Sequence, residues 1–487
     1  MVAINVKDVD SKKEDFNIVQ NSVTNSNDLN FDENSTGLTS EFRLLTFNTW
    51  GLKYVSKFRS ERLVAIADRL ASISSDEKQY DIVALQEIWT QEDWDYIEET
   101  CRDKYPFMRW FSSGIISGPG LAILSKYPIK RTFLYRFPIN GRPSAFFRGD
   151  WYVGKSLAVS ILQMKDGNTV ALLNSHMHAP YSTHGDAAYE CHRACQAWDI
   201  ATLANELKEA GHAVILVGDL NSRPDSLQYR ILQHEAGLHD SWEIINGKTD
   251  LSMIKSMEPC EQITHGGVTC DSTLNTWRAD RQPDEACRLD YALIDNSVIR
   301  PTDASVEFTE KIPSIGSYSD HFAYSASFSM NQELFTDISS LRKSKNIAEN
   351  KFNSLNSDLA NENIDTCGKL NYATDTLASE KLLVYNDLRS MLEVYMATTM
   401  QWQRNWRIGH FAVSLFVFIV FLPVTTAVSY RAPWSSILFV FFGGLILTTG
   451  TVNGLIGLLF GWYEERNLKE ILLEVDDRSK YLKYCNN

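Results

Sequence analysis

The spacing of apolar and polar residues divides this chain into five segments. Residues 1–40 are rich in Ser, Asn and Asp and show little apolar periodicity, which predicts a disordered tail. Residues 41–330 alternate short apolar runs with amphipathic stretches and predict one folded domain. Residues 331–400 turn polar again and predict a linker that leads into a juxtamembrane helix. Two long apolar runs dominate residues 401–465, and residues 466–487 predict a cytosolic helical tail.

Within the folded domain, the short apolar runs are typical of buried strands and the amphipathic stretches are typical of covering helices. The predicted strands are residues 43–48, 81–87, 120–125, 154–163, 169–175, 214–219, 288–294 and 321–328. The predicted helices are residues 59–73, 90–101 and 187–210. Strands and helices that alternate, with both short and long links, favour an α/β fold with helices outside a mixed sheet.

The two apolar runs near the C-terminus predict a transmembrane hairpin. Ile408–Val428 and Ile437–Phe460 contain no Asp, Glu, Lys or Arg, and each is long enough as a helix to cross roughly 30 Å of hydrocarbon. The connection at residues 430–435 is so short that the chain returns to the side it left. The alternative is a pair of buried core helices, which the length of both runs disfavours.

Basic residues set the expected orientation of this hairpin. Its outer ends are flanked by Arg404, Arg407, Arg466 and Lys469, whereas the connection holds only Arg431. Because basic residues favour the cytosolic side, both ends of the hairpin are expected in the cytosol. Arg404 and Arg407 are candidates to meet anionic lipid headgroups, although two arginines alone are a weak signal.

Composition narrows the class of partner. The 487 residues carry a net charge of −14, which argues against the broad basic footprint of a nucleic-acid-binding protein. The eight cysteines lack the paired spacing of a metal site and are expected to be reduced thiols. Cys191 and Cys195 lie four residues apart, a spacing that on a helix is explained by packing.

Polar residues of catalytic type stand at the ends of the predicted strands. Gly218-Asp219-Leu220-Asn221-Ser222 follows one apolar run, and Ser319-Asp320-His321 precedes another. Asn48 and Glu87 also stand at strand ends. A hard cation such as Mg²⁺ takes one or two carboxylates and an amide oxygen, so Glu87 and Asn48 are its candidate ligands.

The remaining candidates supply acid–base chemistry. His176 follows a strand in Asn174-Ser175-His176 and is placed to donate a proton or a hydrogen bond to a phosphoryl oxygen, with His178 as support. Asp290 is a carboxylate that can hold His321 in the tautomer needed to take a proton from water. Each residue alone has an ordinary explanation as a cap or turn residue. Together they predict hydrolysis of a phosphodiester.

These motifs resemble the endonuclease/exonuclease/phosphatase superfamily with the DNase I-like fold, and within it the neutral sphingomyelinases, most closely the inositol phosphosphingolipid phospholipases C. The superfamily motifs are Phe47-Asn48-Thr49-Trp50-Gly51, Leu85-Gln86-Glu87-Ile88-Trp89, Asn174-Ser175-His176, Gly218-Asp219-Leu220-Asn221, Arg288-Leu289-Asp290-Tyr291 and Ser319-Asp320-His321. The narrower likeness rests on residues 137–144, 149–155 and 282–287 and on the C-terminal hairpin.

The resemblance implies a four-layered α/β sandwich and an Mg²⁺-dependent phospholipase C that releases ceramide and a phosphorylated headgroup from inositol phosphosphingolipids and/or sphingomyelin. It implies that Glu87 binds the metal with help from Asn48, and that His321, oriented by Asp290, is the base. Asp219 and Asn221 would arrange water and phosphate. His176 would stabilise phosphoryl charge or protonate the leaving group, and Asp320 would touch metal or water.

Residues 149–156 formally match a Walker A loop, Gly-x-x-x-x-Gly-Lys-Ser. Such a loop needs a helix after its Lys-Ser, whereas residues 157–162 are strand-like, so nucleotide binding is not expected. In the family this string is called P-loop-like, and by analogy Asp150 and Lys155 take part in regulating activity. The alternative is an exposed turn with a local ion pair.

The resemblance also implies a sphingolipid substrate, anionic phospholipids as activators, no nucleic-acid partner, and residence in the endoplasmic reticulum and/or the mitochondrial outer membrane. Two alternatives stay open at this point. One is a DNA-repair-type endonuclease or phosphodiesterase of the same fold, which the acidic balance and the hairpin disfavour. The other is a non-catalytic membrane scaffold, which the intact set of polar residues disfavours.

Overall fold

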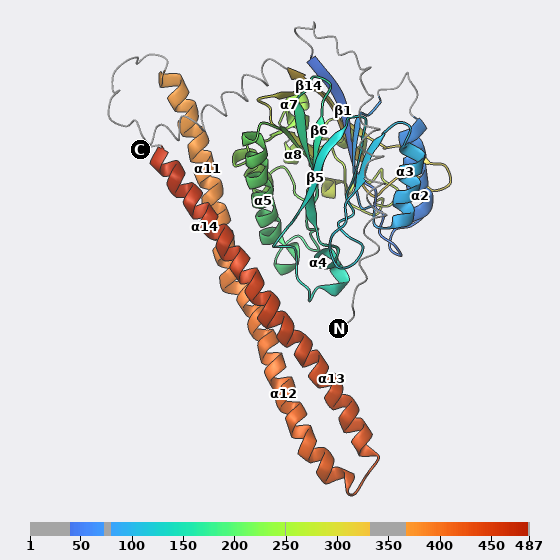
Figure 1. Cartoon of the computed structure of the whole chain (residues 1–487), viewed down its shortest axis with the longest axis vertical. Coiled ribbons are helices and arrows are strands. Elements are labelled where there is room, and N and C mark those ends of the chain that lie inside the picture. Colours follow the sequence, from blue (N-terminus) through green and yellow to red (C-terminus); the bar gives the residue numbers. More distant parts are fainter. Residues whose placement is uncertain (1–38, 73–78, 249, 332–366, 486–487) are drawn as a thin grey trace, which may run out of the picture. The chain divides into compact units, whose positions relative to one another are not determined.

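The computed structural model describes residues 39–72, 79–248, 250–331 and 367–485 (Figure 1). The predicted tail, residues 1–40, lies outside the described residues except for its last two positions. Residues 332–366 of the predicted linker also lie outside them. The strands are β1 (Thr39–Asn48), β2 (Ile82–Gln86), β3 (Phe107–Trp110), β4 (Ala122–Ser125), β5 (Ile129–Arg136), β6 (Ser156–Gln163), β7 (Thr169–His176), β8 (Ala213–Asp219), β9 (His239–Asp240), β10 (Asp290–Ile294), β11 (Ile299–Glu307), β12 (Lys311–Ile312), β13 (Gly316–Ser317) and β14 (Ala323–Asn331).

Helices separate these strands and continue after them. In the domain of residues 39–331 they are α2 (Arg59–Ser72), α3 (Gln91–Cys101), α4 (Asp150–Val153), α5 (Glu190–Glu209), α6 (Leu227–His234), α7 (Ser241–Asn246), α8 (Leu251–Ser256) and α9 (Pro259–Thr264). Three short 3₁₀ turns are η2 (Phe146–Arg148), η3 (Asp186–Ala188) and η4 (Pro283–Glu285). The C-terminal helices are α11 (Cys367–Tyr395), α12 (Gln401–Ser429), α13 (Ser435–Leu455) and α14 (Gly461–Cys485), joined in part by the π-helical turns η5 (Met396–Met400) and η6 (Ile456–Phe460).

Two mixed six-stranded sheets form the centre of this domain. One sheet has the order β11-β14-β1-β2-β4-β3, and the other has the order β5-β6-β7-β8-β10-β9. Alternate residues of each strand point to opposite faces. Leu44 and Ala84 of the first sheet and Leu172 and Val217 of the second share the core between the two sheets.

Helices cover the outer face of each sheet. The opposite faces of β1 and β2 pack on α2 and α3, where Leu63, Ile66 and Trp94 are buried. The second sheet packs on α5 through residues such as Trp198 and Ala201. Figure 1 shows α2 and α3 on one flank and α5 on the other. The predicted α/β fold in four layers is confirmed.

The chain after residue 366 forms two long helical arms. α11 packs its buried Val384, Tyr385 and Leu388 into the same core as α5, together with Leu468 and Ile471 of α14. α11 therefore packs on α14, the helix that follows the hairpin. α12 and α13 run side by side and are long and apolar enough to cross a membrane.

Glycines on α13 allow the hairpin to close. A Cβ atom at Gly450 would lie 2.3 Å from Cβ of Ser414, and one at Gly454 would lie 2.8 Å from the ring of Phe411. Both distances are shorter than any van der Waals contact, so only glycine permits this approach of α12. The Gly-x-x-x-Gly motif at residues 450–454 is thus used within the hairpin.

Candidate functional site

The topology brings the polar strand ends to one edge of the two sheets. β1 and β2 are parallel, so Asn48 and the residue after β2, Glu87, emerge together. β7 and β8 are also parallel, and His176 lies directly beside Asp219 in their register. β10 and β14 run antiparallel to these neighbours and therefore begin where the others end, which adds Asp290 and His321.

His321 and Asp290 form the central pair of this edge. Nδ1 of His321 lies 2.8 Å from Oδ2 of Asp290, and Nε2 lies 3.9 Å from Oδ2 of Asp219. Burial alone would lower the pKa of His321, but the charges of Asp290 and Asp219 outweigh it and hold the pKa well above its usual range. Asp290 thus orients the ring so that Nε2 points toward Asp219.

Asp219 joins the two sheets across the site. Its Oδ2 accepts a hydrogen bond of 3.0 Å from Nδ2 of Asn48 and lies 3.5 Å from Nε2 of His176. Its Oδ1 accepts the backbone N–H of Asn221 at 2.9 Å. Burial raises the pKa of Asp219 to about 6, with His321 acting in the opposite direction.

His176 is a neutral imidazole in this arrangement. Burial and the nearby positive charge of Lys155 lower its pKa well below the usual value. Its Nδ1 is buried without a hydrogen-bond partner among the described residues. A neutral ring with one nitrogen on Asp219 is suited to donate a hydrogen bond to an oxygen that gains charge.

His178 belongs to a different group. Its ring stacks on Tyr189 with the ring centroids 4.0 Å apart, and its Nε2 lies 3.8 Å from Oδ2 of Asp150. Burial lowers the pKa of His178 to about 3. Of these two histidines, the structure therefore places His176 beside Asp219 and His178 beside Asp150.

Glu87 presents a carboxylate suited to a hard cation. It is buried, and burial followed by the charge of Asp320 raises its pKa. Among the described residues, its two oxygens receive hydrogen bonds of 3.2 Å from Asn48 and 3.4 Å from Trp89. A divalent cation here would neutralise the excess of buried carboxylates, so the donor set fits Mg²⁺.

Asn48 and Asp320 form hydrogen bonds that the sequence pattern did not predict. The amide nitrogen of Asn48 faces Glu87 and Asp219, while its Oδ1 accepts the N–H of Trp50 at 3.0 Å. Asn48 thus holds the two carboxylates, and direct metal ligation by its oxygen would require a rotated amide. Asp320 accepts a hydrogen bond of 2.5 Å from Arg278, a residue that sequence reasoning missed.

The P-loop-like string folds as a one-turn helix between two glycines in the left-handed conformation, which glycine adopts without strain. Gly149 and Gly154 have φ values of 81° and 68° and bracket α4, after which β6 begins. The expected absence of a helix after Lys155 agrees with this strand. Lys155 lies 3.4 Å from Asp150. Both residues are buried, so the alternative of an exposed turn is wrong, although the ion pair it included is present.

Lys155 also acts on the catalytic edge itself. Its positive charge contributes to the low pKa of His176 and opposes the effect of burial, which raises the pKa values of Glu87 and Asp219. A buried ammonium this close to the edge is placed to attract a phosphate. The sequence suggested only regulation for Lys155, because nothing in the local pattern shows which strand ends it approaches.

Comparison with known proteins identifies the class of this site. Residues 45–321 match the model of the Endonuclease/Exonuclease/phosphatase family. Inositol phosphosphingolipids phospholipase C of Saccharomyces cerevisiae is 47% identical over 98% of this chain and 97% of its own length. Sphingomyelin phosphodiesterase 2 of Mus musculus is 34% identical over 41% of this chain and 46% of its own length.

A solved structure has a similar but more distant fold. A beta toxin mutant of Staphylococcus aureus, crystallised with bound magnesium ions, is 18% identical, covers 59% of this chain and 99% of its own, and has a TM-score of 0.44.

The chain therefore belongs to the endonuclease/exonuclease/phosphatase family, in the branch that contains the inositol phosphosphingolipid phospholipases C and the neutral sphingomyelinases. Enzymes named phospholipase C or sphingomyelin phosphodiesterase are its close homologues, and the resemblance read from the motifs is confirmed.

Proposed function

We propose that this chain is a membrane-bound, Mg²⁺-dependent phospholipase C. It hydrolyses the phosphodiester of inositol phosphosphingolipids and/or sphingomyelin and releases ceramide and a phosphorylated headgroup. The observation that carries the proposal is the His321–Asp290 pair of 2.8 Å beside Asp219 and His176 at one buried edge. A relative that is 47% identical over 98% of the chain supports the substrate class.

The side chains divide the reaction among themselves. His321 accepts a proton from the attacking water through Nε2, and Asp290 stabilises the imidazolium that forms. Asp219 and Asn221 hold the water and the phosphate. His176 donates a hydrogen bond to the phosphoryl oxygen or to the departing ceramide oxygen. A cation held by Glu87, with Asn48 fixing that carboxylate, would supply charge neutralisation at the phosphate.

Asp150 and Lys155 act as a regulatory pair in this proposal. Their ion pair is buried beside the site, and Tyr181 donates a hydrogen bond of 2.5 Å to Asp150. Turning Lys155 from Asp150 toward the phosphate would add one positive charge to the site. Asp320, tied to Arg278, sets the charge around Glu87.

Membrane attachment is assigned to residues 401–465, with both ends in the cytosol and the membrane that of the endoplasmic reticulum and/or mitochondria. Apolar side chains of α12 and α13 face outward, and Trp151 of the catalytic domain contacts Phe460 at the base of the hairpin with ring centroids 5.2 Å apart. This contact supports a catalytic edge held beside a bilayer. Arg404 and Arg407 lie at the same base, where anionic phospholipids would act as activators.

The test is a headgroup panel on the full-length protein in mixed micelles. Inositol phosphoceramide, sphingomyelin and an abasic DNA duplex are each assayed with Mg²⁺ or with EDTA, and with or without phosphatidylserine. Cleavage of a sphingolipid that needs Mg²⁺ and rises with phosphatidylserine is expected. Glu87→Gln should abolish it, whereas Glu99→Gln, at an exposed position of α3, should not.

Two results would contradict the proposal. Cleavage of the DNA without cleavage of either lipid would favour a nuclease of the same fold. Failure to hydrolyse any substrate by a folded protein would favour a membrane scaffold.

A further inference from the structure

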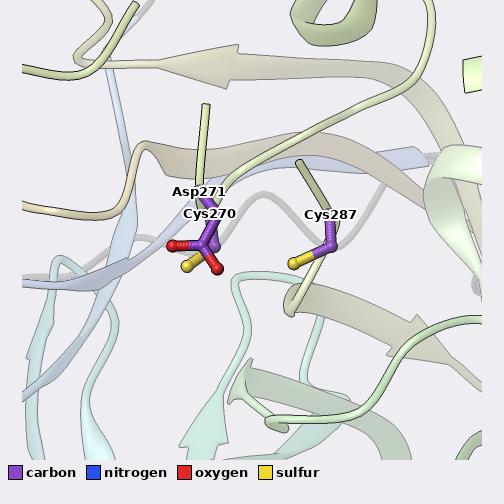
Figure 2. Close-up of side chains that lie close together, drawn as sticks. All are labelled: Cys270, Asp271 and Cys287. Carbon is purple, nitrogen blue, oxygen red and sulfur yellow. The ribbon is translucent and has the colours of Figure 1, made fainter. Parts of the chain in front are cut away.

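Two cysteines meet beside the catalytic histidine. Cys270 and Cys287 lie opposite each other on antiparallel segments, with N–H···O distances of 2.9 and 3.0 Å between their backbones. Their sulfur atoms and a carboxylate oxygen of Asp271 all lie within 4.8 Å of one another (Figure 2). Both cysteines are buried, and Asp271 is partly exposed, which leaves a route for a small ion.

This cluster touches the proposed base. The sulfur of Cys270 lies 3.5 Å from Nε2 of His321, the nitrogen assigned to accept the proton from water. Backbone pairing fixes the approach, because Cys270 also pairs with His321 and the N–H of Phe322 donates to the carbonyl of Thr269 at 2.7 Å. A ligand held by the sulfurs would therefore lie next to the base.

The backbone pairing of the cysteines favours a shared ion over a disulfide. Cβ atoms of directly hydrogen-bonded antiparallel residues lie about 5.5 Å apart, whereas a disulfide needs about 3.5–4.5 Å. Two thiolates bound to one tetrahedral zinc ion at about 2.3 Å lie about 3.8 Å apart. The cation fits without moving the backbone.

Ligand chemistry separates this cluster from the Glu87 site. Thiolate ligands select thiophilic cations such as Zn²⁺, whereas Mg²⁺ requires oxygen ligands. Asp271 adds a carboxylate, although its Oδ1 is shared with Arg278 and Arg281 at 3.5 and 3.3 Å. Nε2 of His321 lies outside this group of three but 3.5 Å from the sulfur of Cys270, so a small shift of the ring would bring it toward the ion.

We propose that Cys270, Cys287 and Asp271 form an inhibitory site for a thiophilic divalent cation of the Zn²⁺ type. Binding converts both thiols to thiolates, releases their protons to solvent and draws Nε2 of His321 toward the ion. The base is then unable to accept a proton from water. The inhibitory part rests on the proposed function, whereas the binding part does not.

The test uses the full-length protein in detergent, freed of metal with EDTA and kept in excess Mg²⁺. Cd²⁺ is titrated to measure thiolate-to-metal charge-transfer absorbance, Zn²⁺ is titrated for equilibrium binding, and lipid hydrolysis is measured at each Zn²⁺ concentration. The wild type is expected to bind one ion, show the absorbance band and lose activity as the site fills.

Cys287→Ser is the decisive variant, because Cys270 is the thiol whose sulfur contacts Nε2 of His321 and is therefore left unchanged. We expect it to lose the band, to weaken Zn²⁺ binding by about tenfold or more, and to raise the inhibitory Zn²⁺ concentration by the same factor. Cys260→Ser, at an exposed thiol, is the matched control and should behave like the wild type. Asp271→Asn serves as a second variant, with circular dichroism to check the fold of each, and should also weaken Zn²⁺ binding.

Other outcomes overturn the inference. Absence of the charge-transfer band in the wild type, or equal inhibition of wild type and Cys287→Ser by Zn²⁺, would contradict the proposed ion site. Diamide treatment that joins Cys270 to Cys287, with loss of two hydrogens by mass and no Cd²⁺ band in the reduced protein, would assign a redox pair instead. A band that disappears in Cys287→Ser from a protein without any hydrolytic activity would support the ion site while contradicting the proposed function.

Discussion

At the catalytic edge the charged side chains are buried, whereas on α12 and α13 the apolar side chains are exposed. Asp219 is 1% exposed, and Val440 is 71% exposed. The first region tolerates buried charge because Asn48, His176 and His321 surround the carboxylate. The second has no protein partner for its outer face among the described residues, so lipid is the environment that matches it. Each region places its side chains in the environment that its chemistry requires.

The largest expected effect comes from removing the proposed base, His321, from the buried edge. His321→Ala should lower lipid hydrolysis by about 10⁴-fold, the upper range for a general base, because no other imidazole pairs with Asp290 in the described structure. Steady-state assays in mixed micelles measure the loss. His184→Ala, at an exposed position, is the control, and equal activity of wild type and His321→Ala would contradict the assignment of the base.

Removing the charge behind the base tests why it is buried. Asp290 raises the pKa of His321, so the base is protonated, and inactive, up to a higher pH than a free imidazole. Asp290→Asn should lower that pKa and move the acid limb of the pH–rate profile to lower pH. The maximal rate should fall by about 10³-fold, because the ring loses its orientation and the imidazolium its counter-charge. An unchanged acid limb would show that another group controls it.

The exposed apolar region is tested by adding a charge to it. Leu445→Arg, at the middle of α13 and 48% exposed, should cost about 3 kcal/mol of insertion free energy, or about 100-fold in the ratio of membrane-bound to soluble protein. Carbonate extraction of membranes measures this ratio. Tyr430→Arg, 91% exposed in the connection beside Arg431, should change it far less. Equal extraction of both variants would argue against α13 as a membrane span.

The last effect is on stability and not on activity, and it is expected where α5 packs on α14. Burial and the neighbouring Glu474 of α14 raise the pKa of Asp199 on α5 to about 8. The folded state therefore holds a proton that the unfolded state releases near pH 4, and this stability is lost as the pH rises toward 8. Asp199→Asn should raise the free energy of unfolding at pH 8 and change it little at pH 4.

Thermal unfolding in detergent at both pH values measures the difference. Asp103→Asn, at an exposed position, should show no such dependence on pH. A gain for Asp199→Asn that is equal at both pH values would indicate a packing effect instead of a titration.

The sequence pattern did not predict the two-residue strands β12 and β13, which pair only with each other. In the two six-stranded sheets, the strands that it did not predict are β3, β5, β9 and β11. All four lie at the edges of the two sheets. β5 consists of exposed and half-buried residues, whereas the predicted β8 is buried throughout. Edge strands are covered on fewer sides than central ones, so they need no continuous apolar run and leave a weaker signal in the sequence.

The sequence by itself determined where the proposed catalytic side chains stand along the chain and where the two long apolar helices lie. Asn48, Glu87, His176 and Asp219 each follow a run of apolar residues, and strand ends and long apolar runs are local properties of a chain. Tertiary structure decided which of these residues touch. Cys270 meets Cys287 across 16 intervening residues, and both lie beside the base only because β10 and β14 begin at the edge where β1 and β8 end. Contacts of this kind depend on sheet order and register, which no local pattern specifies.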